Sequence, residues 1–380
     1  MKDGFFFVES LGCAKNQVDS EMMIAGLSSA GWEYTDTIEN AHLVIVNTCG
    51  FIESAREESI DTILELRARF PGKKIIVAGC LSQRYGDNLA AEIPEMDGFT
   101  GNRSPSSVVS LANSLFPEMD TDKKADTAPE STTIVVPGEP DSEKSVPVFD
   151  RRNHFLSFPG SAYLKIAEGC DNCCTYCAIP LIRGPLASRT VESVVGEVSF
   201  LLEKGIVEFN LIAQDVGSFG VDRGTGSSTA SLLAALSSLR GDFWVRILYI
   251  HPDNFPHEIL SVMKDDPRIL PYFDLPFQHA ASPILRAMGR RGDTDTYIGL
   301  IERIRETLPD AVIRSTFLVG FPGETDADFA ALLDFQKKAR IDWLGAFAWS
   351  PEEDTPAIGL SGKVGKRTAR QRKKLIEESQ

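Results

Sequence analysis

Short apolar segments that alternate with helical stretches limit the fold of this chain more than any other feature. Three of these segments lie near the start of the chain: Phe5–Val8, Leu43–Val46 and Ile75–Ala78. Continuous apolar runs of this length are typical of strands buried on both faces of a parallel sheet. Helices are expected between them, over 18–29, where Asp19-Ser20-Glu21 suits a helix start, and over 54–69. The pattern predicts a doubly wound α/β domain over residues 1–117.

The same alternation resumes beyond residue 156, and a chain of 380 residues is long enough for more than one core. Strands are expected at 163–167, 208–212, 244–250, 272–275, 312–319 and 343–349. Helical stretches lie between them. Repeated βα units of this kind predict a partial, TIM-like barrel of parallel strands over 156–362, in which the chemistry lies at the C-terminal ends of the strands.

Two segments break the alternation. Residues 118–155 are rich in Asp, Glu, Pro, Ser and Thr, which predicts an exposed acidic linker or insertion with room for a short strand at Ile134–Val136. Residues 363–380 begin with a run of Lys and Arg and are expected to form a basic C-terminal helix or linker. A solvated helix face is the simpler interpretation of this run, and a contact to RNA or another anionic partner is the alternative.

The charge balance of the chain restricts its partners. The net charge is −15, which argues against broad binding of a phosphate backbone and is compatible with a basic protein partner. No apolar run is long enough to cross a bilayer, and the N-terminus lacks the pattern of a signal peptide. We therefore expect a cytoplasmic protein without a membrane partner.

Cys170, Cys174 and Cys177 form a C-x3-C-x2-C motif directly after a predicted strand. Three thiolates on one loop can hold three corners of a 4Fe–4S cluster and leave the fourth iron open. That iron can chelate S-adenosylmethionine (SAM), and an electron passed to the sulfonium then releases a 5′-deoxyadenosyl radical. A zinc knuckle that also uses Cys173 is the alternative, but zinc motifs normally join two separated hairpins. Cys173 is then a bystander.

Cys13, Cys49 and Cys80 each stand just past a predicted parallel strand. The C-terminal ends of parallel strands share one edge of the sheet, so we expect these thiols to converge on a second metal site with an open corner. Three ordinary buried cysteines are the alternative. A second open cluster could hold an exchangeable sulfur. A two-cluster electron carrier is less well suited to these residues, because it normally gives each cluster four ligands.

These motifs resemble the methylthiotransferase family of radical SAM enzymes over nearly the whole chain. The motifs that carry the resemblance are SLGCAKNQVDSE, VNTCGFIESA, AGC, KIAEGCDNCCTYCAIP, IRGPLASR, AQDVGSFGVD, DLPFQHA and LVGFPGET. Within the family the chain is similar to the RimO type, which modifies an aspartate of ribosomal protein twelve of the small subunit. The alternative is a tRNA adenosine methylthiotransferase of the MiaB type, but GCAKN and AQDVGSFGVD have the protein-modifying form.

The resemblance implies two 4Fe–4S clusters and assigns a role to each set of cysteines. Cys13, Cys49 and Cys80 would hold the auxiliary cluster, and Cys170, Cys174 and Cys177 the radical cluster. Other residues expected near SAM or the substrate are Tyr176 at the adenine, Gln214 and Asp215 at the methionyl part or substrate, Gln278 on the ribose side, and Gly320, Gly323 and Glu324 after the fifth barrel strand. Arg183 and Arg189 would hold carboxylates or lie on the surface.

The reaction implied by the resemblance uses two SAM molecules and an external electron donor. One SAM methylates a sulfur carried by the auxiliary cluster, and the other yields the radical that removes hydrogen from the β-carbon of the substrate aspartate. The family ends in a small TRAM β-barrel, and this chain stops at Gln380, where that barrel should begin. We therefore expect the barrel to be absent, in a truncated sequence or an unusual member.

Overall fold

The computed structural model describes residues 4–102, 105–117 and 152–380. Of the acidic linker expected over 118–155, residues 118–151, with the short strand expected at Ile134–Val136, lie outside the described residues. Residues 152–155 are described, and Arg152 among them is buried. The chain divides into two compact units. The N-terminal unit comprises Met1–Phe158 together with Leu181–Gly184, and the barrel unit comprises Pro159–Pro180 and Pro185–Gln380.

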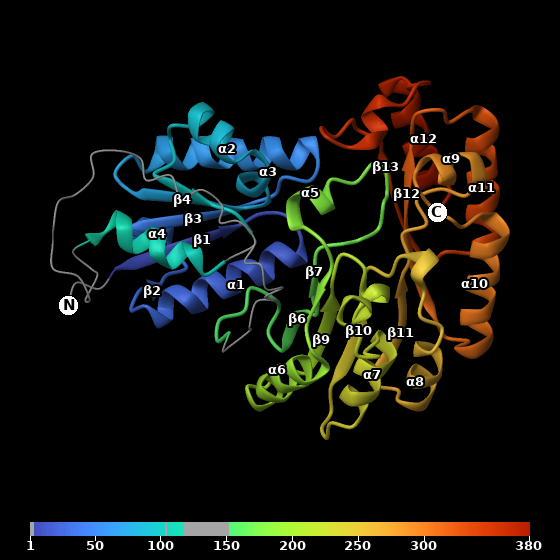
Figure 1. Cartoon of the computed structure of the whole chain (residues 1–380), viewed down its shortest axis with the longest axis horizontal. Helices are drawn as coiled ribbons and strands as arrows, with labels where there is room; N and C mark the ends of the chain where they lie inside the picture. Colours follow the sequence, from blue (N-terminus) through green and yellow to red (C-terminus); the bar gives the residue numbers. More distant parts are fainter. Residues whose placement is uncertain (1–3, 103–104, 118–151) are drawn as a thin grey trace. The chain divides into compact units, whose positions relative to one another are not determined.

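The N-terminal unit contains a five-stranded parallel sheet in the order β2-β1-β3-β4-β5 (Figure 1). Its strands are β1 (Phe5–Ser10), β2 (Glu33–Tyr34), β3 (Leu43–Thr48), β4 (Lys74–Gly79) and β5 (Gly98–Thr100). Its helices are α1 (Ala14–Ser29), α2 (Glu53–Arg69), α3 (Cys80–Glu92) and α4 (Ser107–Leu115). Every strand pair is parallel, and each long strand is followed by a helix, as the apolar runs predict.

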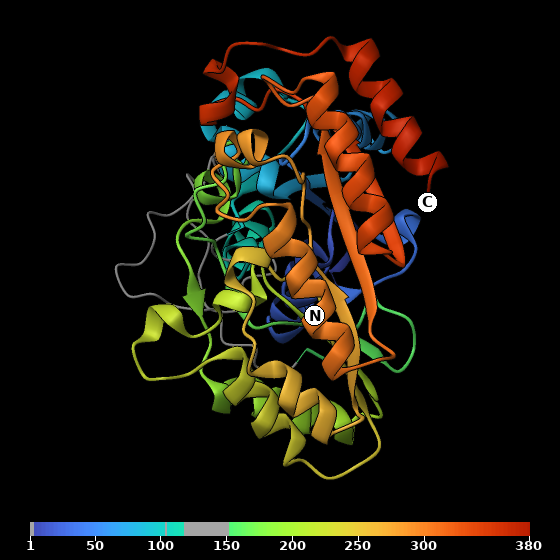
Figure 2. The same cartoon turned by 90° about the vertical axis from the view of Figure 1, so that its right-hand side faces the viewer.

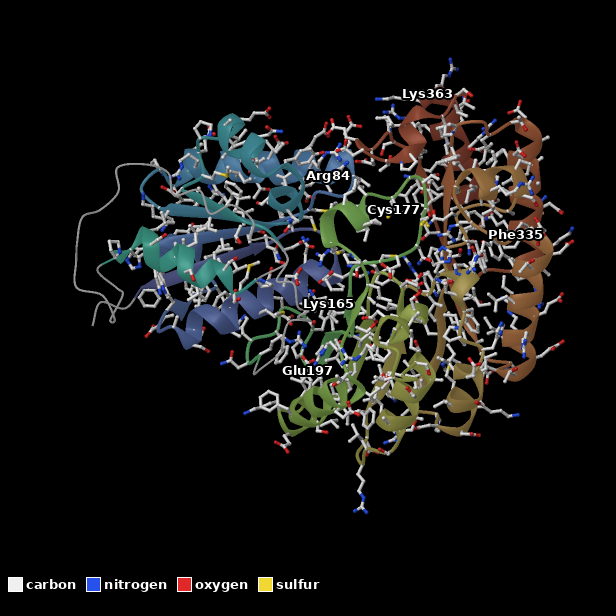
Figure 3. The ribbon with its side chains drawn as sticks, viewed as in Figure 1. Arg84, Lys165, Cys177, Glu197, Phe335 and Lys363 are labelled. Carbon is white, nitrogen blue, oxygen red and sulfur yellow. The ribbon has the colours of Figure 1, made fainter. Side chains whose placement is uncertain are left out.

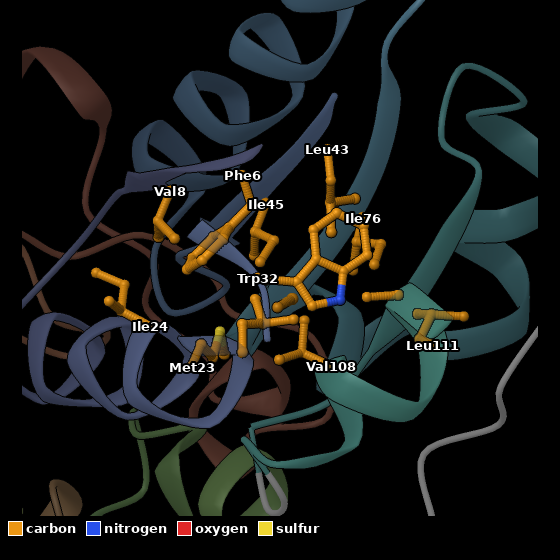
Figure 4. Packing of buried hydrophobic residues seen from close by; sticks show 13 residues of the cluster. Phe6, Val8, Met23, Ile24, Trp32, Leu43, Ile45, Ile76, Val108 and Leu111 are labelled. Carbon is orange, nitrogen blue, oxygen red and sulfur yellow. The ribbon is translucent and has the colours of Figure 1, made fainter. Parts of the chain in front are cut away.

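The sheet of this unit is buried on both faces. On one face Phe6, Ile45 and Ile76 pack with Met23 of α1 and Leu111 of α4 (Figure 4). On the other face the alternate residues of β3 and β4 pack against α2 and α3. This explains why the central strands read as continuous apolar runs, since successive side chains point to opposite buried faces.

Helix α1 begins at Ala14, four residues before the expected start. Asp19-Ser20-Glu21 does not begin the helix, because these three side chains lie inside it and are fully buried. A buried polar stretch of this kind needs partners within the protein. It therefore belongs to the interior of the unit.

The barrel unit contains six parallel strands in the order β13-β12-β11-β10-β9-β6. They are β6 (Ser161–Lys165), β9 (Glu208–Ile212), β10 (Trp244–Ile247), β11 (Ile269–Asp274), β12 (Val312–Val319) and β13 (Trp343–Ala348). A small antiparallel ladder joins β7 (Ala167–Glu168) to β8 (Ala187–Ser188). The sheet order follows the chain order, as expected for a partial barrel built from successive βα units.

The helices of the barrel unit follow its strands (Figure 2). They are α6 (Val191–Glu203), α7 (Thr229–Ser237), α8 (Ile259–Asp265), α9 (Ser282–Ala287), α10 (Thr294–Thr307), α11 (Asp326–Ala339) and α12 (Lys366–Glu378). The short helix α5 (Ile179–Arg183) is divided between the units, because its residues from Leu181 onward belong to the N-terminal unit. Alternate residues of β12 are buried, and Phe317 on that strand packs against Phe335 of α11 with ring centroids 6.0 Å apart. Thr325 caps α11 with a capping box.

The basic C-terminal segment forms α12, which packs against β13 and β12. Its residues Lys366, Arg367, Arg370 and Lys374 are exposed, in agreement with a solvated face. Arg372 differs, because its side chain is buried and paired with Glu324. Across the part of the chain that the structure describes, no helix combines the length and the apolar composition needed to span a bilayer.

Candidate functional site

The three cysteines of the N-terminal unit lie at one edge of its sheet. Cys13 follows β1 as the N-cap residue of α1, Cys49 follows β3, and Cys80 follows β4 as the first residue of α3. The three strands are neighbours and parallel, so their C-terminal ends share this edge. The edge therefore gathers the three thiols expected there.

The contacts of Asn16 show how close two of these sulfurs lie. Asn16 Oδ1 is 4.0 Å from Cys13 Sγ and 3.5 Å from Cys80 Sγ, so these sulfurs are at most 7.5 Å apart, the sum of the two distances. Cys49 has both of these thiols as electrostatic neighbours. The thiols are near enough to bind one polynuclear group, with each sulfur on a different metal atom.

The surroundings of these thiols fit a bound iron–sulfur cluster. Burial raises the pKa of Cys49 to about 11 and also raises the pKa of Cys80, so binding of iron has to displace their protons. Cys13 is exposed. A Cβ on Gly50 would lie only 2.7 Å from the backbone carbonyl of Cys80, so glycine is required where the loops after β3 and β4 meet. The site thus has one buried ligand position at Cys80, one half-buried position at Cys49 and an open side at Cys13.

Arg183 and Arg189 are both buried, so neither is a surface arginine. Arg183 belongs to the N-terminal unit, and its Nη2 lies 3.1 Å from Asp19 Oδ2. Arg189 belongs to the barrel unit and donates from Nη1 to Glu197 Oε2 at 2.5 Å; Glu197 is labelled in Figure 3. Each arginine therefore holds a carboxylate, and in both cases that carboxylate is part of the protein.

The loop that leads from β7 into α5 carries the other cysteine motif. Cys170, Cys174 and Cys177 are electrostatic neighbours, and Cys177 is labelled in Figure 3. Each sulfur also has a nitrogen nearby: Asn172 Nδ2 is 3.4 Å from Cys170, His251 Nε2 is 3.7 Å from Cys174, and the backbone N of Ile179 is 3.5 Å from Cys177. Such contacts orient thiolate ligands and stabilise their charge.

His251 stands beside Cys174 in a defined protonation state. Burial and the nearby Arg290 lower the pKa of His251 to about 4, so the ring is neutral at pH 7. Its Nδ1 accepts a hydrogen bond from the backbone N–H of Asp253 at 3.2 Å. Nε2 therefore carries the ring proton and directs it toward the Cys174 sulfur.

Asp215 joins the loops around the C-x3-C-x2-C motif. Its carboxylate is buried and accepts five hydrogen bonds of 2.7–3.0 Å from the backbone N–H groups of Gly217 and His251 and the side chains of Ser218, Asn172 and Asn254. These donors come from the loops that follow β7, β9 and β10. The carboxylate thus fixes loop geometry, and a direct contact of Asp215 with a ligand stays a prediction.

Gln214 belongs to a polar chain at the ends of β6 and β9. Lys165, labelled in Figure 3, donates to Glu168 Oε2 at 2.6 Å, and Glu168 Oε1 accepts from Gln214 Nε2 at 3.0 Å. Gln214 Oε1 is buried and has no hydrogen-bond partner within residues 4–102, 105–117 and 152–380. A buried carbonyl oxygen of this kind is ready to accept a hydrogen bond from a bound ligand.

Tyr176 lies between two of the cysteines and packs against Phe321, with ring centroids 6.4 Å apart. Its hydroxyl accepts a hydrogen bond from Arg290 Nη2 at 3.0 Å.

Gln278 has a positive φ of 67°, which is strained for a residue other than glycine. Its backbone still pairs with β12 through Thr316 and Leu318. Such strain at a strand end is typical of functional positions.

Glu324 follows β12, but its carboxylate turns inward. One oxygen accepts hydrogen bonds from the backbone N–H groups of Gly320 and Phe321. The other lies 3.1 Å from Arg372 Nη1 and 4.0 Å from His279 Nε2. Gly320 and Gly323 adopt positive φ values of 74° and 88°, which glycine permits without strain. These residues build a tight turn beside the strand end.

Cys173 differs from the cysteines around it, because it is exposed and its Sγ contacts only the Asp171 carbonyl, at 3.8 Å, among its recorded hydrogen-bond partners. Across the described residues, no three His, Cys, Asp or Glu side chains lie close enough to share one metal ion. A zinc knuckle that includes Cys173 therefore has no support from the geometry. Ligands of a cluster are spread over several iron atoms and do not need such close grouping.

Known proteins match the chain over nearly its whole length. The family model described as "Uncharacterized protein family UPF0004" matches residues 5–101, and "Radical SAM superfamily" matches residues 164–335. A relative from Treponema denticola named "Ribosomal protein uS12 methylthiotransferase RimO" is 44% identical over 97% of this chain and 80% of its own. A relative of the same name from Carboxydothermus hydrogenoformans is 41% identical over 99% of this chain and 82% of its own. The chain belongs to the RimO family. It is a radical SAM methylthiotransferase.

Solved structures share the fold of this RimO-family chain. The radical SAM methyltransferase TsrM from Kitasatospora setae matches with a TM-score of 0.67 at 16% identity, over 94% of this chain and 74% of that one. The cobalamin-dependent radical SAM enzyme OxsB matches with a TM-score of 0.61 at 12% identity, over 99% of this chain and 56% of that one. Both confirm the predicted architecture of a parallel-sheet α/β domain followed by a radical SAM barrel.

Several side chains around the cysteines of the RimO-family chain are missing from the sequence-based expectations. Asn16 and Asn102 contact the sulfurs of the N-terminal unit, and His251 and Arg290 surround the motif in the barrel. Asn16 lies within the motif SLGCAKNQVDSE, three residues after Cys13, so both residues lie at the N-terminal end of α1. The other three are far from the cysteines in sequence, so no local pattern indicates them.

Proposed function

We propose that this chain transfers a methylthio group to the β-carbon of an aspartate in ribosomal protein uS12, with two SAM molecules and two 4Fe–4S clusters. One observation carries the proposal: two separate sets of three unpaired cysteines stand at the C-terminal ends of strands, one set in each unit. Each set leaves one corner of a cluster without a protein ligand. One open cluster suits a radical initiator, and a second suits the holding of a transferable sulfur.

The residues proposed to hold the clusters are Cys13, Cys49 and Cys80 in the N-terminal domain, residues 1–117, and Cys170, Cys174 and Cys177 in the barrel, residues 156–362. When bound, the barrel cluster and SAM supply a 5′-deoxyadenosyl radical, and the auxiliary cluster supplies the methylthio group. The β-carbon of an aspartate has no readily acidic proton, so a general base alone would not activate it. The protein contributes orientation, charge balance and exclusion of water.

Specific side chains of the barrel are proposed to orient SAM. Gln214 Oε1 is a buried oxygen without a hydrogen-bond partner among the described residues. It could therefore accept a hydrogen bond from the methionyl part of SAM or from the substrate. Tyr176 has an aromatic face beside the cysteine loop, which suits the adenine. Gln278 stands on the expected ribose side. Asp215, Gly320 and Glu324 would act by holding the loops around these groups.

The remaining parts of the proposal concern the partners. We propose that the substrate is a basic ribosomal protein in the cytoplasm and that an external donor supplies the electron. The net charge of −15 supports a basic partner. Action on a tRNA adenosine is not favoured, because relatives that are 40–44% identical to this chain carry the uS12 name.

The substrate is tested with two competing acceptors. The chain is reconstituted anaerobically and offered uS12 and, separately, an anticodon stem-loop RNA, and mass spectrometry records which of them gains a methylthio group. We expect the gain on uS12. A gain on the RNA alone would overturn the substrate assignment.

The auxiliary ligands are tested by Cys13→Ala. We expect methylthiolation to fall below detection while some 5′-deoxyadenosine is still formed, because the barrel cysteines are unchanged. Cys173→Ser serves as the control and should retain both reactions. Survival of both reactions in Cys13→Ala would show that the assignment of Cys13 is wrong.

A further inference from the structure

We propose that Arg183 and Asn102 are positioning residues that donate hydrogen bonds to the Cys80 sulfur and raise the reduction potential of the auxiliary cluster. The inference rests on the proposed function to the extent that Cys80 is a cluster ligand. Among the three thiols of this edge, Cys80 is the only one buried, at 5% exposure. It also has two N–H donors beside it, Arg183 Nη2 at 3.4 Å and Asn102 Nδ2 at 3.3 Å.

The guanidinium of Arg183 is held in place from several sides. Its Nη2 donates to Asn16 Oδ1 at 2.7 Å and to Asp19 Oδ2 at 3.1 Å. Its side chain is 2% exposed and that of Asp19 is fully buried. A buried, paired guanidinium of this kind loses little freedom when it also contacts a sulfur, so its position is preorganised.

Asn16, which receives the Arg183 hydrogen bond, is itself fixed to the loops that carry the cysteines. Its Nδ2 donates to the Leu11 carbonyl at 3.1 Å and to the Thr48 carbonyl at 2.8 Å. Leu11 lies two residues before Cys13, and Thr48 lies directly before Cys49. The arginine is therefore tied to both other cysteine loops as well as to Cys80.

Asn102 approaches Cys80 from the loop after β5, 22 residues further along the chain. It follows β5 and is 3% exposed. Its Oδ1 is buried and finds no hydrogen-bond partner in the part of the chain that the structure describes. Among the described residues, the Asn102 side chain thus has the Cys80 sulfur as its hydrogen-bond partner.

These donors should affect the cluster in a definite direction. Hydrogen bonds to ligand sulfurs and the net charge nearby are principal determinants of the potential of an iron–sulfur cluster. Reduction adds negative charge, and an N–H donor or a cation in a buried site stabilises that charge more strongly than in water. Arg183 supplies both, and Asn102 supplies the donor alone. Loss of either should lower the reduction potential, and loss of Arg183 should lower it more.

The experiment isolates the auxiliary cluster in the full chain. Cys170, Cys174 and Cys177 are replaced by Ala, the protein is reconstituted anaerobically, and the midpoint potential is measured by a redox titration followed by electron paramagnetic resonance. Arg183→Gln, Arg183→Lys and Asn102→Leu are compared with Arg67→Gln. Arg67→Gln is a matched control, because it also removes an arginine of this unit that is paired with an aspartate, Asp97. This pair lies at the N-terminal end of β4, whereas Cys80 lies at the C-terminal end.

We expect Arg183→Gln to lower the reduction equilibrium constant at least tenfold, which is about 59 mV for one electron. Arg183→Lys should retain part of the effect, Asn102→Leu should give a smaller shift of the same sign, and Arg67→Gln should give none. An unchanged midpoint in Arg183→Gln with full iron content would overturn the proposal. So would loss of iron from both Arg183→Gln and Asn102→Leu with Arg67→Gln intact, because their role would then be in cluster assembly.

The outcomes also separate this inference from the proposed function. If the parent protein with three alanines binds neither iron nor sulfide, the auxiliary site itself is wrong and both proposals fall. If the midpoint shifts as expected while the unaltered enzyme leaves uS12 unmodified, the tuning role stands and the substrate assignment fails.

Discussion

Cys173 and Cys174 are adjacent in the chain and have different surroundings. Cys174 faces the Nε2–H of His251 at 3.7 Å, whereas Cys173 is exposed beside the Asp171 carbonyl. We predict that Cys174→Ser loses most of the barrel iron and reduces 5′-deoxyadenosine formation at least about a hundredfold, since removal of metal ligands or their partners has effects of this size. Cys173→Ser should retain both within about twofold. Iron, sulfide and product assays measure the difference, and equal losses in the two variants would favour a site that uses all four cysteines.

Asp97 provides a pH-dependent test at the N-terminal end of β4. Burial opposes ionisation of Asp97, but hydrogen bonds from Lys74, the backbone N–H of Ile75 and Arg67 outweigh it and lower the pKa. A carboxyl with a lowered folded pKa stabilises the protein above its unfolded pKa, and this contribution is lost as the pH falls through the folded value.

We therefore predict that Asp97→Asn lowers the free energy of unfolding by about 1.5–3 kcal/mol at pH 7, the range for hydrogen bonds to charged groups. The difference from the unaltered chain should shrink below about pH 4, where the carboxyl of the unfolded chain is protonated. Urea unfolding across this pH range measures it. Asp61→Asn on the exposed side of α2 is the control, and a penalty that did not change with pH would contradict the electrostatic explanation.

Helix α12 is joined to the turn after β12 by one buried ion pair. Arg372 Nη1 lies 3.1 Å from Glu324 Oε1, with the two side chains 7% and 0% exposed, and Arg372 Nη2 also contacts Asp326 at 2.6 Å. Removal of one partner of a buried pair leaves an uncompensated charge and costs about 3–5 kcal/mol. We predict a loss of this size for Arg372→Met, measured by chemical denaturation. The double variant Arg372→Met/Glu324→Gln should recover part of it, and simple additivity of the two losses would argue against the coupling.

The elements of this fold were predictable where burial makes the sequence pattern strong. The strands β3 and β4 are buried on both faces, and each appears as an uninterrupted apolar run. β2 has two residues and β5 has three, too few to show a period. The start of α1 was placed too late, because Asp19, Ser20 and Glu21 lie inside the helix and are polar residues buried by the tertiary structure. Asp and Ser are typical at helix N-termini, so the sequence pattern alone indicates a helix start at these residues.

The candidate site was predictable in its cysteines and much less in their partners. Thiols at the ends of parallel strands share an edge by topology alone, so their convergence follows from the sequence. Arg183 and Asn102 reach Cys80 across 103 and 22 residues. Such contacts depend on the packed loops, and neither residue type is distinctive enough to indicate a sulfur contact. The inward turn of the Glu324 carboxylate depends on α12 in the same way.

The charge of the whole molecule gives a prediction that distinguishes the two kinds of substrate. At a net charge of −15, long-range attraction should accelerate encounters with the basic ribosomal protein that we propose as substrate, and salt should screen that attraction. We predict that the association rate constant for uS12 falls about tenfold when monovalent salt rises from about 0.05 to 0.3 M, as measured by stopped-flow fluorescence. The turnover rate at saturating uS12 should change little, because the attraction that salt screens acts before the complex forms.

For an anionic RNA, salt screens the overall repulsion instead, so the association rate constant of the RNA should rise with salt. A rate for uS12 that rises with salt would show that the acidic surface does not guide this substrate.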